Sequence, residues 1–184
     1  MCKRNQKERR CAMMEFERCM AMAERLILEQ RVDEGMRLLT ELLYDEPGSA
    51  ALHNELGWGY LYFVGNPAQA ELHLEAAIRF EPAFAPPYLH LGNLHSQAGR
   101  YSLALDWFAR GLRRAGANRG ALAAGMGWAH EMRGEYRLAI RRYKESLAVS
   151  AGPEYESLRE SIRRCRGKRW ILMLDTAVSY RRSV

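Results

Sequence analysis

Cysteine is scarce in this chain of 184 residues, and none of the four cysteines belongs to a C-x-x-C pair. A structural zinc site needs several thiolate or imidazole ligands that converge on one point, and no histidine cluster accompanies these thiols. Cys2, Cys11, Cys19 and Cys165 are therefore interpreted as scattered reduced thiols. No metal site is expected.

Long apolar runs are missing as well. No stretch approaches the ~20 apolar residues that a membrane-spanning helix needs. The apolar run from Trp170 to Leu174 is stopped by Asp175. Near the N-terminus, Glu15 and Glu17 interrupt what would be the apolar part of a signal peptide. The sequence therefore predicts a cytoplasmic protein.

Common catalytic and cofactor-binding motifs are also absent from the sequence. The sequence contains no G-x-x-x-x-G-K-[ST] loop, no G-x-G-x-x-G after a strand and no G-x-S-x-G elbow. No two of its five histidines are four residues apart, as a zinc pair on one helix would be. These histidines are His53, His73, His90, His95 and His130. We expect no enzyme activity and no cofactor.

Charge is unevenly distributed along the chain. The formal net charge is +6, but residues 1–15 carry +3 and residues 159–184 carry +6, which leaves the middle of the chain at −3. The basic character therefore belongs to the two ends, and it is weak support for nucleic-acid binding by the whole chain.

What the sequence does contain is a short motif that occurs three times. A glycine is followed five residues later by an alanine at Gly65, at Gly99 and at Gly134, so that the motif recurs after 34 and then 35 residues. Self-similarity at this period predicts a solenoid of stacked helical hairpins. Small residues at Gly57, Gly92 and Gly127 are expected to let two helix backbones approach closely.

Further residues around this motif extend the pattern: Leu56-Gly57 with Tyr60, Leu91-Gly92, the alanines Ala70, Ala104 and Ala139, the aromatics Phe108 and Tyr143, and the pairs Glu46-Pro47 and Glu81-Pro82 at the ends of the first two units. With these residues, the pattern resembles the tetratricopeptide repeat family. The resemblance implies an all-α, right-handed α-solenoid of helix-turn-helix repeats with a C-terminal capping helix. Its four expected units are residues 16–49, 50–84, 85–119 and 120–153.

The segments outside these units are less regular. Residues 1–15 form a basic segment that is either a genuine, disordered tail or a mis-called start, with translation beginning at Met13 or Met14. Residues 154–184 are basic and amphipathic and predict one capping helix, or a helix pair broken at Gly167. The repeat spacing is uneven near Val64 and near Asn118, where the solenoid is expected to depart from regularity.

In the family that the chain resembles, the first helix of each unit lines a concave groove. Helical spacing then predicts which side chains face this groove: Asn54, Trp58, Tyr62, Leu89, His90, Asn93, Gln97, Trp128 and Met132. Amides can bond a peptide backbone, aromatics supply binding hot spots, and methionine adapts to irregular apolar partners. The expected function is an adaptor, scaffold or chaperone-like module that binds a partner peptide or helix. In the competing interpretation, the C-terminal helix fills the groove or the aromatics are partly buried between units.

The basic C-terminal segment offers a second class of function. Its cationic residues are Arg159, Arg163, Arg164, Arg166, Lys168 and Arg169. They could contact nucleic-acid phosphates or an anionic membrane surface, with Trp170 and Tyr180 as interfacial aromatics and the repeats as a scaffold. The plainer interpretation is a solvated face of the capping helix.

Overall fold

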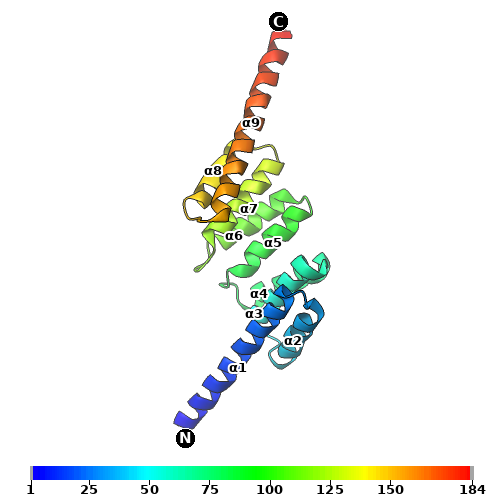
Figure 1. Cartoon of the computed structure of the whole chain (residues 1–184), viewed down its shortest axis with the longest axis vertical. Helices are drawn as coiled ribbons and strands as arrows, with labels where there is room; N and C mark the ends of the chain where they lie inside the picture. The colour runs from blue at the N-terminus through cyan, green and yellow to red at the C-terminus, as the bar shows by residue number, and fades with distance from the viewer. Residues whose placement is uncertain (1, 183–184) are drawn as a thin grey trace. The chain divides into compact units, whose positions relative to one another are not determined.

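The computed structural model describes the backbone of residues 2–182 and the side chains of residues 14–174, and every regular element in this part of the chain is helical (Figure 1). The elements are α1 (Cys2–Leu28), α2 (Val32–Asp45), α3 (Ala50–Gly59), the π-helix η1 (Tyr60–Val64), α4 (Pro67–Phe80), α5 (Pro86–Gln97), α6 (Tyr101–Gly111), α7 (Arg119–Met132), α8 (Tyr136–Leu147) and α9 (Pro153–Arg182). Sequential helices form antiparallel pairs. The predicted all-α fold of helical hairpins is thereby confirmed.

The chain divides into two compact units, Met1–His90 and Leu91–Val184, and each is described by itself. The division falls inside α5. Helix α1 already begins at Cys2, so the backbone of the basic N-terminal segment is helical. The side chains of residues 1–13 lie outside the described residues. The alternative start at Met13 or Met14 and the four repeat boundaries stay predictions.

The first unit is built around α3, which packs against both α2 and α4. Its core consists of Ala23, Ile27, Met36, Leu39, Leu52 and Leu56. The close approach predicted at Gly57 is real, because a Cβ atom placed there would lie 2.6 Å from Cγ of Leu74 on α4. Only a residue without a side chain allows the two helices this separation.

The irregular spacing near Val64 has a local structural cause. Helix α3 continues into the π-helix Tyr60–Val64, a wider turn that absorbs one extra residue without breaking the helix. The segment ends at Gly65, which adopts a φ of 71°, and Asn66 then caps α4 by accepting a bond of 3.1 Å from the Gln69 N–H. The extra residue is therefore confined to one turn.

In the repeated glycine–alanine motif, the glycine ends one helix and the alanine packs in the next. In the second unit, Gly99 and Gly134 have φ values of 72° and 75°, and the residue after each glycine donates its N–H back to the preceding helix. This left-handed turn is a common helix ending that favours glycine. The alanines that follow, Ala104 and Ala139, are fully buried against neighbouring helices.

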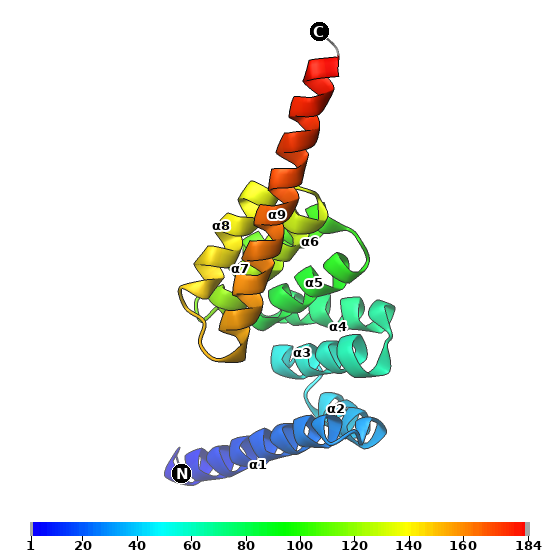
Figure 2. The same cartoon turned by 45° about the horizontal axis from the view of Figure 1, so that its top comes forward.

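Helix α9 is one continuous helix, and Gly167 does not break it (Figure 2). The expectation of a helix pair is therefore wrong. A single glycine inside a helix costs only about 1 kcal/mol, and its neighbours outweigh this cost. The first half of α9 packs on α8 through Leu158, Ile162 and Cys165. Among the described helices, none combines the length and the apolarity that crossing a membrane would take.

Gly167→Ala is expected to raise the free energy of unfolding by about 0.5–1 kcal/mol, because alanine favours the helix and restricts the unfolded chain. A Cβ atom at this position meets no atom within 4 Å, so the substitution creates no clash. Urea unfolding followed by circular dichroism measures the change. A loss of stability would contradict a helix that runs unbroken through residue 167.

Candidate partner-binding site

The predicted groove residues lie in both units, so they form two separate sets. The first unit contains Asn54, Trp58, Tyr62, Leu89 and His90, and the second contains Asn93, Gln97, Trp128 and Met132.

In the first unit, an aromatic surface forms where α3 passes into the π-helix. The Tyr62 side chain is 41% exposed, and its ring meets the edge of His90 with 5.8 Å between the centroids. The Trp58 ring is half-buried and packs on Phe63 at 4.8 Å. Leu89, from the first turns of α5, is half-buried. This surface is therefore apolar and held in place by ring contacts.

His90 belongs to this surface as a neutral ring. Burial lowers the pKa of His90 to about 4, so the imidazole is uncharged at neutral pH. Its Nδ1 atom is buried and has no hydrogen-bond partner among the described residues. The side chain thus acts as an aromatic contact for Tyr62 rather than as a charged ligand for a partner.

Asn54 is not on an open surface, contrary to the prediction. Its side chain is only 4% exposed, and its amide donates to the Glu55 carboxylate at 3.3 Å. The reason is that both α2 and α4 cover the first turns of α3, where Leu52 and His53 are buried too. Helical spacing gives the direction of a side chain but not the number of helices packed around it.

The sequence reasoning also missed a histidine pair in the first unit. The Nδ1 atoms of His53 and His73 are 3.0 Å apart, and His53 Nε2 lies 3.2 Å from the Pro47 carbonyl oxygen. Since a carbonyl only accepts, His53 carries its proton on Nε2 and His73 Nδ1 is the donor between the rings. Burial, and then His53, lower the pKa of His73. Twenty residues of separation give no sequence signal for this pair.

This histidine pair has a packing role. Tyr60 stacks on His73 at 5.6 Å, and Phe80 stacks on His53 at 5.4 Å. No group of three or more metal-binding side chains occurs among the residues that the structure describes. The rings therefore tie α3 and the π-helix to α4.

In the second unit, the predicted residues lie on α5 and α7. The Trp128 ring is half-buried and meets Tyr101 edge-on at 5.8 Å, while Met132 is 41% exposed. Asn93 is half-buried and Gln97 is exposed. Trp128 also packs against the core between α8 and α9, as Trp58 packs against the core of the first unit, so the interpretation that the aromatics are partly buried applies to both tryptophans.

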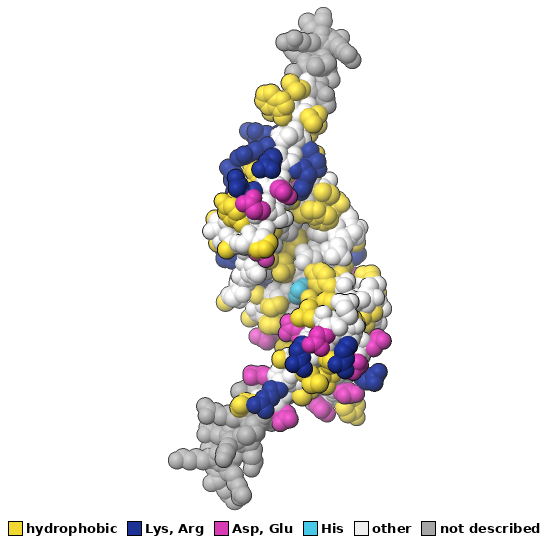
Figure 3. All heavy atoms as spheres, viewed as in Figure 1, with side chains coloured by type: hydrophobic (Ala, Val, Ile, Leu, Met, Phe, Trp, Pro, Cys, Tyr) yellow, Lys and Arg dark blue, Asp and Glu magenta, His cyan; other side chains and the backbone are white. Residues whose placement is uncertain are grey.

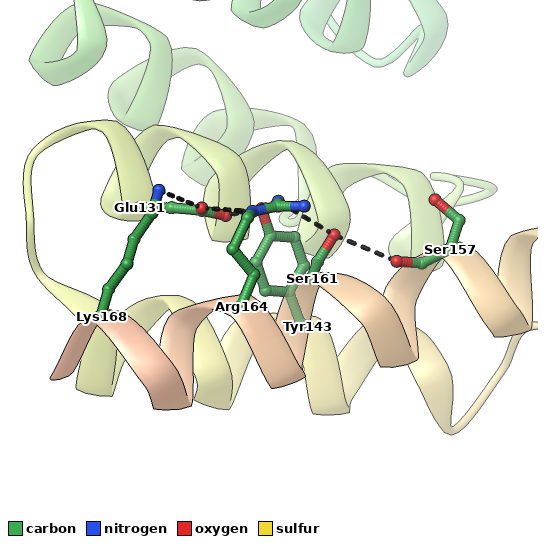
Figure 4. Close-up of polar contacts among 6 residues, drawn as sticks. All are labelled: Glu131, Tyr143, Ser157, Ser161, Arg164 and Lys168. Carbon is green, nitrogen blue, oxygen red and sulfur yellow. Dashed lines mark hydrogen bonds and ion pairs between the residues drawn. The ribbon is translucent and has the colours of Figure 1, made fainter. Parts of the chain in front are cut away.

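Two of the predicted basic-patch residues form ion pairs with a carboxylate of the same chain. Arg164 donates two hydrogen bonds to Glu131, at 2.7 and 2.8 Å, and Lys168 donates a third at 2.9 Å (Figure 4). Tyr143 adds its hydroxyl at 3.1 Å. Arg164 and Lys168 on α9 are thus charge partners of a buried carboxylate on α7. Their charges are paired within the fold, and the assignment of these two residues to a phosphate-binding patch stays a prediction.

The electrostatics of this cluster follow from its donors. The Arg164 guanidinium, with Lys168 and Tyr143, holds the pKa of Glu131 at about 2, so the carboxylate stays charged although it is only 2% exposed. Burial, reinforced by Glu131, raises the pKa of Cys165 to about 12 and keeps that thiol protonated. The cluster therefore fastens α9 to α7 and α8. Its partners are 33 and 37 residues away from Glu131, so sequence spacing could not reveal it.

The other four residues of the predicted basic patch are exposed: Arg159, Arg163, Arg166 and Arg169. Figure 3 shows these cations gathered on the helix, with apolar side chains beyond them. A cavity of about 730 Å³ lies near the start of the same helix, where α7 begins and α8 ends. Small side chains such as Ala121, Ala124 and Ser146 line most of it, and Glu154 is the charged residue of its lining.

No protein-family model matches the sequence, and no curated protein does either. Solved structures do resemble the chain. MamA protein has a TM-score of 0.69 at 20% identity, over 91% of this chain and 88% of MamA. PilF of Pseudomonas aeruginosa has a TM-score of 0.75 at 14% identity, over 84% of this chain and 68% of PilF. PilW, a type IV pilus biogenesis factor, has a TM-score of 0.74 at 16% identity, over 82% of this chain and 68% of PilW.

At these identities the similarity shows the fold. MamA, PilF and PilW are tetratricopeptide proteins. The chain therefore has the tetratricopeptide-type fold that its repeated glycine–alanine motif predicts.

Proposed function

We propose that this chain is a non-catalytic adaptor, scaffold or chaperone-like module that holds a peptide or helix of a partner protein. The binding residues would be Trp58 and Tyr62 in the first unit and Trp128 and Met132 in the second. One observation carries the proposal. In each unit, a large side chain with 41% of its surface exposed (Tyr62 or Met132) lies one turn along the helix from a half-buried tryptophan.

The chemistry of these positions supports binding. Tryptophan and tyrosine offer a large contact area and lose little conformational entropy on binding. Trp58 is already held by Phe63 and Trp128 by Tyr101, which reduces that loss further. The exposed Gln97 amide supplies both a donor and an acceptor for the backbone of a bound segment.

The burial of Asn54 and His90 changes the part that these two predicted groove residues take in the proposal. Asn54 is removed from the proposed binding residues because it is buried, and His90 takes part as a neutral aromatic ring. Asn93 and Leu89 are half-buried and stand beside the proposed contacts. The cytoplasmic location and the absence of enzyme activity stay predictions from the sequence.

A photo-crosslinking amino acid placed at position 62 or 132 is expected to trap a partner protein in cells of the source organism. The two positions are tested separately, because each unit presents its own surface beside a half-buried tryptophan. Gel shifts followed by mass spectrometry identify the adducts.

Matched positions provide the control. Tyr44 is 89% exposed in the first unit, and Leu138 is 38% exposed in the second, but neither is beside a tryptophan on the proposed surface. Probes there are expected to give no adduct with that partner. Equal trapping from positions 44 and 138, or none from 62 and 132, would refute the assignment.

A further inference from the structure

The side chains of α9 fall on three distinct faces, as its helical register requires. One face packs on α8 through Leu158, Ile162 and Cys165. A second face turns Arg164 and Lys168 toward Glu131 on α7. The third face contains Arg159, Arg163, Arg166, Trp170 and Leu174, at successive spacings of four, three, four and four residues. We call this third set the outward face.

The outward face is basic for two turns and apolar for the next. Arg163 and Arg166 are exposed and have no carboxylate partner among the described residues, and Arg159 forms only an exposed ion pair of 3.4 Å with Glu156. Trp170 is 62% exposed and Leu174 is 50% exposed. Figure 3 shows the cationic group on α9 followed by an apolar group farther along the helix.

We propose that the outward face of α9 binds the surface of an anionic lipid bilayer. Arginine guanidiniums pair with lipid phosphates at the headgroup level, and tryptophan prefers the boundary between headgroups and acyl chains. From Arg163 to Leu174 the helix is about 16 Å long, so both kinds of contact fit along one helix lying in the interface. Ile171 and Met173, at 59% and 57% exposure, flank Trp170 and Leu174 and widen the apolar contact.

The combination of charge and apolar surface favours a bilayer over the alternatives. A nucleic acid would pair with the arginines but would leave Trp170, Ile171 and Leu174 in water. A bilayer satisfies both halves of the face. The Glu131 contacts hold the packed faces of α9 in place, so the outward face is presented without any rearrangement of the helix.

Sedimentation with lipid vesicles tests the proposal on the full-length chain. Vesicles of phosphatidylcholine alone are compared with vesicles in which roughly one third of the lipid is phosphatidylglycerol. We expect binding to the anionic vesicles that is at least about 10-fold stronger than binding to the neutral ones, and a decrease in that binding as salt rises.

Two double variants separate the contributions of charge and apolar surface. Arg163→Glu with Arg166→Glu is expected to weaken binding to anionic vesicles by at least about 10-fold. Trp170→Ser with Leu174→Ser, which changes no charge, is expected to weaken it by about 10-fold.

Each double variant has a control with the same chemical change elsewhere in the second unit. Arg113→Glu with Arg137→Glu makes the same change in net charge, and Leu103→Ser with Val149→Ser removes two exposed apolar side chains. Both controls are expected to bind anionic vesicles like the unaltered chain, and circular dichroism checks that all four variants retain their helicity.

Four results would overturn the proposal. The first is no preference for anionic vesicles, and the second is full binding by either outward-face variant. The third is tighter binding of the chain to a DNA duplex than to the vesicles, which would assign the arginines to nucleic acid. The fourth is a change of oligomeric state: the unaltered chain is dimeric by sedimentation equilibrium, and the Trp170→Ser, Leu174→Ser variant is monomeric but binds vesicles unchanged. That result would assign the face to a second copy.

Discussion

Glu131→Gln is expected to lower the free energy of unfolding by about 2 kcal/mol at pH 7. The buried carboxylate accepts three charge-assisted hydrogen bonds from Arg164 and Lys168 and one from Tyr143. A neutral amide weakens the charged contacts. Because the Arg164 and Lys168 side chains are 48% and 41% exposed, water can hydrate them in the variant, and the loss is smaller than for a fully buried pair. Urea unfolding measures the difference.

The same carboxylate makes stability depend on pH. The pKa of Glu131 is lowered from 4.5 to about 2 in the folded chain, so the carboxylate contributes its full stabilisation above pH 4.5. This contribution is lost as the pH falls from 4.5 toward about 2, where the carboxyl becomes protonated in both states. The unaltered chain and Glu131→Gln should therefore differ most near neutral pH and converge at about pH 2.

A surface glutamate provides the control for this prediction. Glu145 pairs with Arg141 at 3.8 Å and Arg142 at 2.7 Å on the exposed side of α8. Glu145→Gln is expected to change the free energy of unfolding by no more than about 0.5 kcal/mol. If it cost as much as Glu131→Gln, the buried cluster would have no special role. Hydrogen exchange in α9 should rise only in the Glu131 variant.

Gly92→Ala is expected to lower the free energy of unfolding by about 2–3 kcal/mol, although alanine is the better helix former by about 1 kcal/mol. The ring of Phe108 on α6 lies directly against Gly92 on α5, and a Cβ atom there would overlap it. The ring cannot retreat, because a Cβ atom at Gly125 on α7 would also lie only 2.5 Å from it. Thermal and urea unfolding measure the loss.

A smaller side chain at position 108 tests the cause. In a Phe108→Leu background, Gly92→Ala is expected to cost less than about half as much, because leucine leaves room for the new methyl group. Equal costs in both backgrounds would show that the contact with Phe108 is not responsible. Gly167→Ala, which adds the same methyl group in open space, should have the opposite sign.

The exposure of the proposed binding residues could be predicted from the sequence only in part. Tyr62, Gln97 and Met132 are exposed, as helical spacing predicts. It was wrong for Asn54, because the helices before and after α3, α2 and α4, both pack against it and Asn54 is buried. The residues Arg164 and Lys168 look like a solvated patch in the sequence, and only folding brings them to Glu131.

The sequence by itself determined the repeat, the all-α fold and the positions of the turns, since these depend on local properties. Glycine at 65, 99 and 134 is needed for a left-handed backbone, and alanine five residues later is needed for close packing. The tertiary structure decided which surfaces remain open. Burial and ion pairing depend on side chains that are distant in sequence, as the bond between Glu131 and Arg164 shows. For the same reason, only the folded helix separates the outward face of α9 from the faces that pack within the molecule.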